Sequence, residues 1–148
     1  MIIRRIEAND IENLSNLFND YRVFYKMKCD LEGAKRFLLE RFKNNESLIF
    51  VAENGEKTLI GFVQLYPIFS STRMKSLLLL NDLFVHEEHR GRGISILLIN
   101  RAKELCIENN SCGIVLETAK SNIIGNKLYP KVGFSIDLEH NYYSWDNI

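Results

Sequence analysis

The stretch from residue 76 to residue 105 constrains the fold of this chain more than any other. It begins with residues 76–85, an apolar run with the composition of a strand that is covered on both faces. A short polar loop follows, and Gly91 and Gly93 then open a segment whose apolar residues recur with helical spacing. A buried strand that continues through a glycine-containing loop into an amphipathic helix is typical of a domain in which helices cover a sheet.

The remaining sequence predicts further elements around this unit. The expected strands are residues 2–6, 48–52, 59–68, 114–116, 134–138 and 142–145, the last two forming a closing hairpin. Pro67 is expected to end the strand in which it lies. Helices are expected after Asp10 and after Asp30, which suit N-cap positions, and from residue 121 or 122 to about Tyr129. The predicted order is therefore βααβββαβαββ, a mixed α/β fold in a single domain over residues 1–148.

Composition argues against several classes of function. The 148 residues include 19 Lys plus Arg and 19 Asp plus Glu, so there is no basic excess to indicate a nucleic-acid partner. No apolar run approaches the length of a membrane span, and no signal peptide is recognisable. The three cysteines form no Cys-x-x-Cys pair, which favours reduced thiols without a metal. We therefore expect a cytoplasmic protein with no nucleic-acid, membrane or metal partner.

The loop at residues 90–95 has the chemistry of a phosphate site. The first amides of a helix point outward with partial positive charge, and Gly91 and Gly93 carry no Cβ to hold a ligand away. Arg90 and Arg92 add charged donors. A Walker A loop is excluded because Gly93 is not followed by Lys, and a dinucleotide fingerprint is excluded by Ile96. A solvated basic turn is the alternative interpretation.

Two motifs resemble those of the GNAT superfamily of acetyl-CoA-dependent N-acetyltransferases. The first is Arg/Gln-x-x-Gly-x-Gly/Ala, which here is Arg90-x-x-Gly93-x-Ser95, with serine in the last place. The second is Asn-x-x-Ala-x-x-Leu/Phe-Tyr closed by Gly-Phe; the matching residues are Asn122, Gly125, Leu128, Tyr129, Gly133 and Phe134. Within the superfamily, residues 77–96 look most like the polyamine and related small-amine branch. Asn81 departs from that branch, since it replaces a glutamate associated with proton removal.

The resemblance implies a mostly antiparallel sheet with a splayed central parallel pair, and acetyl-CoA as co-substrate. A backbone amide of the central strand would stabilise the charge that develops on the thioester oxygen. Asn122 would hydrogen-bond near the coenzyme, although a helix N-cap explains it equally well. The residues expected to contact acetyl-CoA are Leu83, Phe84, Val85, Arg90, Gly91, Arg92, Gly93, Ile94, Ser95, Asn122 and Tyr129.

Three residues are candidates for proton transfer. By the resemblance, Tyr129 donates a proton to the departing sulfur; the alternative is a packing role. Asp82 and Glu117 lie near the middle of predicted central strands, and either carboxylate could take the proton of the amine. We prefer Asp82 and keep Glu117 as the second choice, with a water path in place of a dedicated base as a further possibility.

The acceptor site is expected near the first helix. Tyr21, Arg22 and Tyr25 belong to an aromatic and basic cluster there, and Asp82 would join them as a substrate contact. Aromatic faces attract a cationic amine, whereas Arg22 suits an acceptor carboxylate. Packing of the rings against the sheet is the alternative.

The predicted function is transfer of an acetyl group from acetyl-CoA to a primary amine of a small molecule, by direct attack in a ternary complex. Two alternatives stay open: acetylation of protein lysines or N-termini, and a non-catalytic acyl-CoA-binding sensor. The closing strand near residue 145 suggests a homodimer contact.

Overall fold

The computed structural model describes residues 1–148, which divide into two units, residues 1–117 and 118–148. The first unit contains a five-stranded sheet in the order β1-β2-β3-β4-β5. Its first four strands are antiparallel neighbours, and β5 lies parallel to β4. The strands are β1 (Ile2–Arg5), β2 (Leu48–Glu53), β3 (Leu59–Ser70), β4 (Lys75–Val85) and β5 (Ile114–Val115). The mixed α/β architecture with one parallel pair is thus confirmed.

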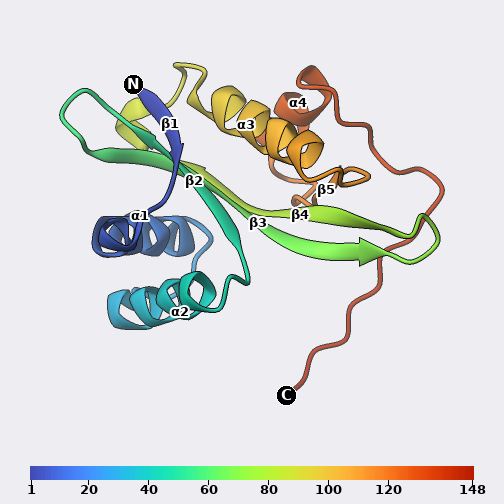
Figure 1. Cartoon of the computed structure of the whole chain (residues 1–148), viewed down its shortest axis with the longest axis horizontal. Coiled ribbons are helices and arrows are strands. Elements are labelled where there is room, and N and C mark those ends of the chain that lie inside the picture. Colours follow the sequence, from blue (N-terminus) through green and yellow to red (C-terminus); the bar gives the residue numbers. More distant parts are fainter. The chain divides into compact units, whose positions relative to one another are not determined.

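Three helices cover the sheet of the first unit. These are α1 (Ile11–Phe24), α2 (Leu31–Lys43) and α3 (Ile94–Glu108). The first two lie on one face of the sheet and α3 lies on the other (Figure 1). Beneath α1 and α2, Leu14 and Leu38 are fully buried in one cluster with Phe62 of β3 and Phe84 of β4. No helix combines the length and the apolar surface that crossing a bilayer needs.

The two predicted N-caps have different outcomes. Asp30 caps α2 as expected, since its carboxylate accepts the Gly33 amide at 2.9 Å. Asp10 does not cap α1 through its side chain. Its carboxylate instead accepts two bonds from Arg4, at 2.7 and 2.9 Å, and one from the Glu7 amide at 2.7 Å. The Arg4 guanidinium holds the pKa of Asp10 below its usual value. The ion pair also joins β1 to the turn before α1.

Pro67 does not end β3, contrary to the sequence prediction. The strand continues to Ser70 and pairs with β4 throughout, with Pro67 opposite Leu78. The Leu78 amide donates to Gly113 on the β5 side, so the Pro67–Leu78 pair is one whose backbone groups point away from each other. Because β2 begins at Leu48, opposite Leu65, and does not reach Pro67, no strand needs the amide hydrogen that proline lacks.

The second unit contains one helix, α4 (Ile123–Lys131). Asn122 caps it by accepting the Gly125 amide at 3.1 Å, and the helix continues one residue past Pro130. Residues 134–148 form no strand, so the predicted closing hairpin is wrong and the observed order is βααβββαβα. An alternating apolar pattern is not enough to form a strand pair. A two-stranded hairpin is stable only when one of its faces is covered by other parts of the protein. The strand at 114–116 is also shorter than expected and half-exposed.

Candidate active site

A β-bulge shapes β4 at the position where the chemistry was predicted. Gln64 pairs with Asp82, whereas the next residue, Leu65, pairs with Leu80. Asn81 is therefore an extra residue on β4, and such a bulge redirects the side chains beside it. As a result Asn81 and Asp82, although adjacent in sequence, both line the same pocket.

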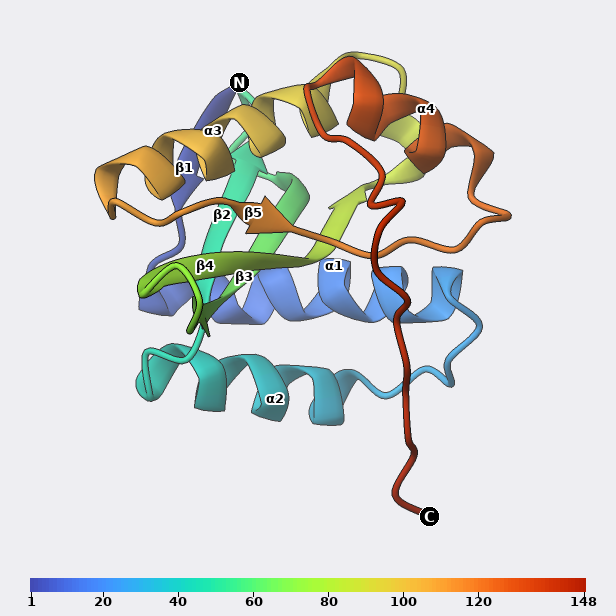
Figure 2. The ribbon, with the colours of Figure 1, turned by 90° about the vertical axis from the view of Figure 1, so that its right-hand side faces the viewer.

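Beyond the bulge, one edge of β4 has no strand beside it. β5 pairs only with Leu78 and Leu79, and β4 continues to Val85 (Figure 2). The His86 amide donates to the Ile60 carbonyl at 2.9 Å, so the backbone groups of His86 point toward β3. Along a strand, the backbone groups of successive residues point alternately toward one neighbour and the other. By that alternation, the backbone groups of Leu83 and Val85 point away from β3 toward the open edge. The backbone of Phe84 points toward β3, so Phe84 can offer a ligand only its ring.

The loop before α3 presents backbone rather than side chains. Gly91 and Gly93 have φ values of 75° and 76°, a left-handed conformation that strongly favours glycine. A Cβ built on either glycine would meet nothing within 4 Å, so the space beside them is open. No side chain caps α3, which leaves the amides of residues 94–96 without an intrahelical acceptor. Ile94 has its side chain in the core, 3% exposed, so its amide is what it can offer a ligand.

The two arginines of the loop differ in what they already bind. Arg90 folds back onto β4: its Nε donates to the Val85 carbonyl at 2.9 Å. Its guanidinium also lies over the rings of Phe24, at 5.0 Å, and Phe84, at 5.4 Å. Arg92 makes a single long bond of 3.3 Å to the Glu88 carbonyl and is exposed. Arg92 is therefore the more available charge, and Arg90 anchors the loop to the strand.

The turn between β4 and this loop holds one group of potential metal ligands. Ligand atoms of His86, Glu88 and His89 lie within 4.8 Å of one another. The Glu88 amide donates to Nδ1 of His86 at 3.4 Å, so one of these nitrogens already has a weak partner.

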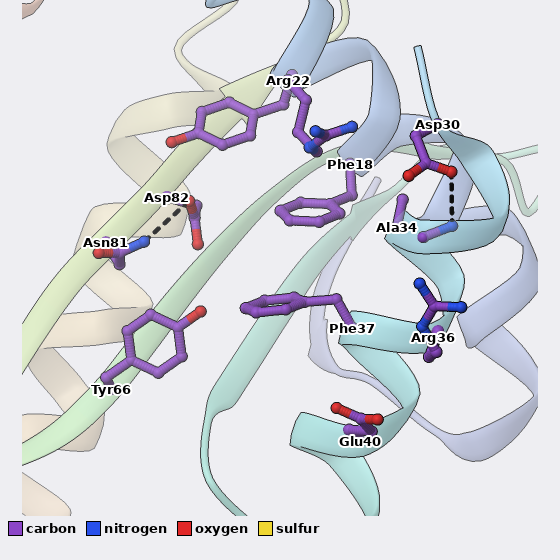
Figure 3. A pocket seen from close by; sticks show the side chains of 12 residues that line it. Phe18, Arg22, Asp30, Ala34, Arg36, Phe37, Glu40, Tyr66, Asn81 and Asp82 are labelled. Carbon is purple, nitrogen blue, oxygen red and sulfur yellow. Dashed lines mark hydrogen bonds between the residues drawn. The ribbon is translucent and has the colours of Figure 1, made fainter. Parts of the chain in front are cut away.

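On the other face of the sheet, a cavity of about 460 Å³ lies between β3, β4 and the helices α1 and α2 (Figure 3). Three of the predicted substrate residues line it: Tyr21, Arg22 and Asp82. Tyr25 does not. It is half-exposed just after α1, with its ring edge-on to Tyr21 at 5.0 Å. The other lining residues are Phe18, Asp30, Gly33, Ala34, Arg36, Phe37, Glu40, Tyr66 and Asn81.

Asp82 is the buried charge of this cavity. It is 5% exposed and accepts hydrogen bonds from Nε2 of Gln64 at 2.7 Å and Nδ2 of Asn81 at 3.1 Å. Both donors are neutral amides, and no Lys, Arg or His forms an ion pair with Asp82. A buried carboxylate normally has a paired cation, so this one faces the cavity without a salt-bridge partner.

Aromatic side chains surround that charge. Phe18 of α1 and Phe37 of α2 stack with their centroids 5.8 Å apart and their planes at 10°. The hydroxyl of Tyr66 points into the cavity from β3 (Figure 3). Burial, with the nearby charge of Asp82, raises the pKa of Tyr66 to about 12, so its phenol stays protonated at physiological pH. Sequence reasoning missed Phe37 and Tyr66, although Tyr66 follows Phe62 and Gln64 at strand spacing.

The other predicted proton-transfer residues, Glu117 and Tyr129, are not among the residues that line the cavity. Glu117 is exposed and lies two residues beyond β5, not in the middle of a strand as expected. Tyr129 lies in α4 of the second unit, half-buried, with its ring edge-on to Phe134 at 5.8 Å. The Asn122 side chain makes two hydrogen bonds inside that unit: it accepts from the Gly125 amide and donates to Thr118 Oγ1.

The match to a protein family decides the identity of the chain. Residues 11–134 match the acetyltransferase (GNAT) family. The chain belongs to the GNAT family of acetyltransferases. The chain is similar to an uncharacterized N-acetyltransferase of Bacillus subtilis, YhfO, which is 41% identical over 97% of this chain and 95% of its own length.

Two further proteins are similar over nearly the whole chain. A probable acetyltransferase of Haemophilus influenzae is 35% identical, over 88% of this chain and 93% of its own length. The crystal structure of a probable acetyltransferase superposes with a TM-score of 0.95 at 34% identity, covering 100% of this chain and 99% of that one. Their names specify acetyl transfer and no acceptor, so the acceptor of this GNAT protein has to be argued from its own pocket.

Proposed function

We propose that this GNAT protein transfers the acetyl group of acetyl-CoA to a primary amine of a small molecule, by direct attack while both substrates are bound. The observation that carries the proposal is the buried carboxylate of Asp82, which has no ion-pair partner and faces an aromatic cavity. A protonated amine is the complement of such a site, because it neutralises the carboxylate while aromatic faces favour the cation.

Asp82 would also prepare the amine for reaction. An alkylammonium has a pKa of roughly 10.4, so at neutral pH it must lose a proton before its nitrogen can attack. The ammonium proton passes to a carboxylate oxygen of Asp82, directly or through a water, and from there to solvent. Gln64 and Asn81 hold that carboxylate in place, and the Tyr66 hydroxyl offers a further hydrogen bond to the acceptor.

The residues at the open edge of β4 and at the start of α3 fit a coenzyme. The free amides of residues 94–96, the open space beside Gly91 and Gly93 and the exposed charge of Arg92 suit a diphosphate. The amides of Leu83 and Val85 suit a carbonyl oxygen on which negative charge develops. Acetyl-CoA, when bound, supplies the thioester whose acetyl group the amine takes.

Tyr129 is proposed as the acid of the reaction. Its phenol would give a proton to the departing sulfur, so that the acetyl group moves from sulfur to nitrogen and a proton arrives on sulfur. This assignment rests on the Asn122–Tyr129 motif and on the helix that Asn122 caps.

The cavity favours a small acceptor over a protein chain. Its 460 Å³ is within the range of small-molecule sites, and it is bounded by two helices as well as by the sheet. Its charged residues are mixed, with Arg22 and Arg36 beside Asp30, Glu40 and Asp82. Polyamines and amines that carry a carboxylate are therefore both candidate acceptors.

A thiol-release assay tests the proposal. Purified protein with acetyl-CoA should release free thiol only when a suitable amine is added, from a panel of polyamines, amino acids and amine-bearing drugs. A peptide panel, analysed by mass spectrometry for acetylated lysines and N-termini, runs in parallel. Turnover of peptides but not of free amines would overturn the small-molecule proposal. Binding of CoA measured by calorimetry, with no turnover of either panel, would show a sensor instead of an enzyme.

A further inference from the structure

The turn between β4 and α3 gathers three side chains that can each bind a metal. It is a single turn of 3-10 helix, Glu87–His89, that begins at His86, and the His89 amide donates to the His86 carbonyl at 2.9 Å. Such a helix has three residues per turn, so residues three positions apart lie on the same side. The imidazole rings of His86 and His89 therefore face the same region, with their centroids 6.1 Å apart.

Glu88 completes a compact set of ligands. Its carboxylate and one nitrogen of each histidine lie within 4.8 Å of one another. Tetrahedral zinc holds nitrogen and oxygen ligands at about 2.0–2.2 Å, so the bound donor atoms are about 3.4 Å apart. The set therefore has to close by at most about 1.4 Å. Rotation of the side chains can supply this movement, because Glu88 is exposed and both histidines are half-exposed.

The groups around this set leave it available to a cation. The carboxylates of Glu87 and Glu88 offset the charges of the two arginines that follow, Arg90 and Arg92. Arg92 donates to the Glu88 carbonyl, and the Glu88 carboxylate forms no ion pair. The bond from the Glu88 amide to Nδ1 of His86 is 3.4 Å long and therefore weak, so a metal can replace it.

We propose that His86, Glu88 and His89 form a binding site for a transition-metal dication, with Zn²⁺ as the representative ion. Two imidazoles and one carboxylate suit zinc, copper and nickel, whereas Mg²⁺ and Ca²⁺ prefer a set made of oxygen atoms alone. Three protein ligands leave the fourth position of a tetrahedral ion to water. The sequence prediction of no metal partner rested on the spacing of the cysteines, and this site uses none of them.

The bound ion would fix the turn from which the glycine loop before α3 starts. Arg90 directly follows His89, and Arg92 donates to the Glu88 carbonyl, so the turn and the loop are joined. None of the three ligands lines the cavity beneath α1 and α2. The metal site is therefore independent of the identity of the acceptor.

Calorimetry tests the site, with zinc chloride titrated at neutral pH into the full chain, prepared without a histidine tag. One Zn²⁺ per chain should bind, and excess Mg²⁺ should not displace it. Even the hydrogen-bond partners of a ligand contribute about tenfold to a hundredfold to metal affinity, so His89→Gln should weaken binding by at least about tenfold. Absence of saturable binding, or equal affinities in the wild type and His89→Gln, would overturn the proposal.

His140→Gln is the matched control for the loss of an imidazole. His140 belongs to the second unit, where its Nδ1 lies 2.8 Å from a carboxylate oxygen of Asp137. It thus has a carboxylate neighbour but no second histidine beside it in the sequence. This variant should keep the affinity for Zn²⁺ within about twofold, and a loss as large as that of His89→Gln would contradict the assigned ligands.

NMR of the imidazole nitrogens identifies the ligands in the wild type, so the result does not depend on how a variant folds. Addition of Zn²⁺ should shift the ring resonances of His86 and His89 and leave those of His140 unchanged. Shifts confined to His140, or equal at all three histidines, would mean adventitious binding, and the proposal would fail. Glu88→Gln tests the third ligand and should lower the affinity for Zn²⁺ by at least about tenfold. An unchanged affinity in that variant would overturn the three-ligand site.

Discussion

The cavity beneath α1 and α2 and the loop that opens α3 adjoin the same strand, β4, but they are built from different chemical groups. In the cavity, the charge of Asp82 is held by the side chains of Gln64 and Asn81. In the loop, Gly91 and Gly93 leave backbone amides with no side chain over them. Acceptor selection should therefore depend on side-chain chemistry, and donor binding on backbone conformation. Substitutions in the two regions should separate the two functions.

The largest effect is expected from Asp82→Asn. The amide keeps the shape of the side chain and can still accept from Gln64, but it neither attracts an ammonium nor takes its proton. We expect kcat/KM for the amine to fall by about 10²–10⁴, the usual contribution of a positioned acid or base. The affinity for CoA, measured by calorimetry, should stay within about twofold, because it depends on the other region.

Glu117→Gln is the matched control, since it removes the same charge from the exposed carboxylate beyond β5. It should change kcat/KM by less than about threefold, as expected of a group outside the reaction. If Asp82→Asn lost no more activity than Glu117→Gln, Asp82 would not be the dedicated base. A small loss in both variants would then indicate a water path, and a larger loss in Glu117→Gln would indicate Glu117.

Tyr129→Phe tests a residue that is part of neither the cavity lining nor the loop before α3. Loss of the phenol should lower kcat by about tenfold to a hundredfold, less than for a base because a thiol leaves readily without a full proton transfer. Initial rates and CoA binding are measured on the same preparation. Tyr25→Phe, at a tyrosine outside the cavity, should leave both unchanged. A parallel loss of kcat and CoA affinity in Tyr129→Phe would indicate a packing role rather than an acid.

Gly93→Ala tests the loop. At a φ of 76°, a Cβ costs roughly 1–2 kcal/mol, so the loop shifts and CoA affinity should fall about tenfold. The KM for the amine, measured at saturating acetyl-CoA, should hardly change. Gly55→Ala is the control, because its Cβ would also meet nothing within 4 Å but its φ is not in the left-handed region. A larger effect on the amine than on CoA would contradict the division between the two regions.

Most of the fold follows from local sequence signals. Apolar periodicity located the strands and helices of residues 1–117, and Asp30 and Asn122 begin their helices through bonds within three residues. The errors occur where a distant partner decides. The Asp10 carboxylate binds Arg4 instead of capping α1. β3 continues past Pro67 because β2 reaches only as far as Leu65. Residues 134–145 have a strand pattern but form no strand.

The site was predictable in part for the same reason. The α3 loop could be recognised because its glycines and arginines are adjacent in sequence. The cavity could be recognised only in part, through Tyr21, Arg22 and Asp82. The rest could not, because Phe37 and Tyr66 reach it from α2 and β3, and because the bulge at Asn81 depends on the β3–β4 register. The folding back of Arg90 onto Val85 is likewise a tertiary contact that its motif does not encode.

The smallest effect on activity is expected from Tyr66→Phe, which sharpens the electrostatic description of the cavity. Removal of the hydroxyl should change kcat/KM for the amine by less than about fivefold, since one neutral hydrogen bond is lost. Its clearer signature is in stability at high pH. The ordinary pKa of tyrosine is 10.0 and that of Tyr66 is raised to about 12, so between these values the unfolded chain loses the phenol proton first. The free energy of unfolding of the wild type should therefore fall as pH rises through this window, relative to Tyr66→Phe.

Urea unfolding of both proteins from pH 8 upward measures that difference. Below about pH 10 the difference between the two free energies should be constant, because Tyr66 is protonated in both states. Asp82→Asn provides an internal test, since the charge of Asp82 is one cause of the raised pKa of Tyr66. In that background the pH at which the folded phenol ionises should move down. Parallel curves for wild type and Tyr66→Phe up to the alkaline limit would mean that the cavity neither buries this phenol nor places the Asp82 charge beside it.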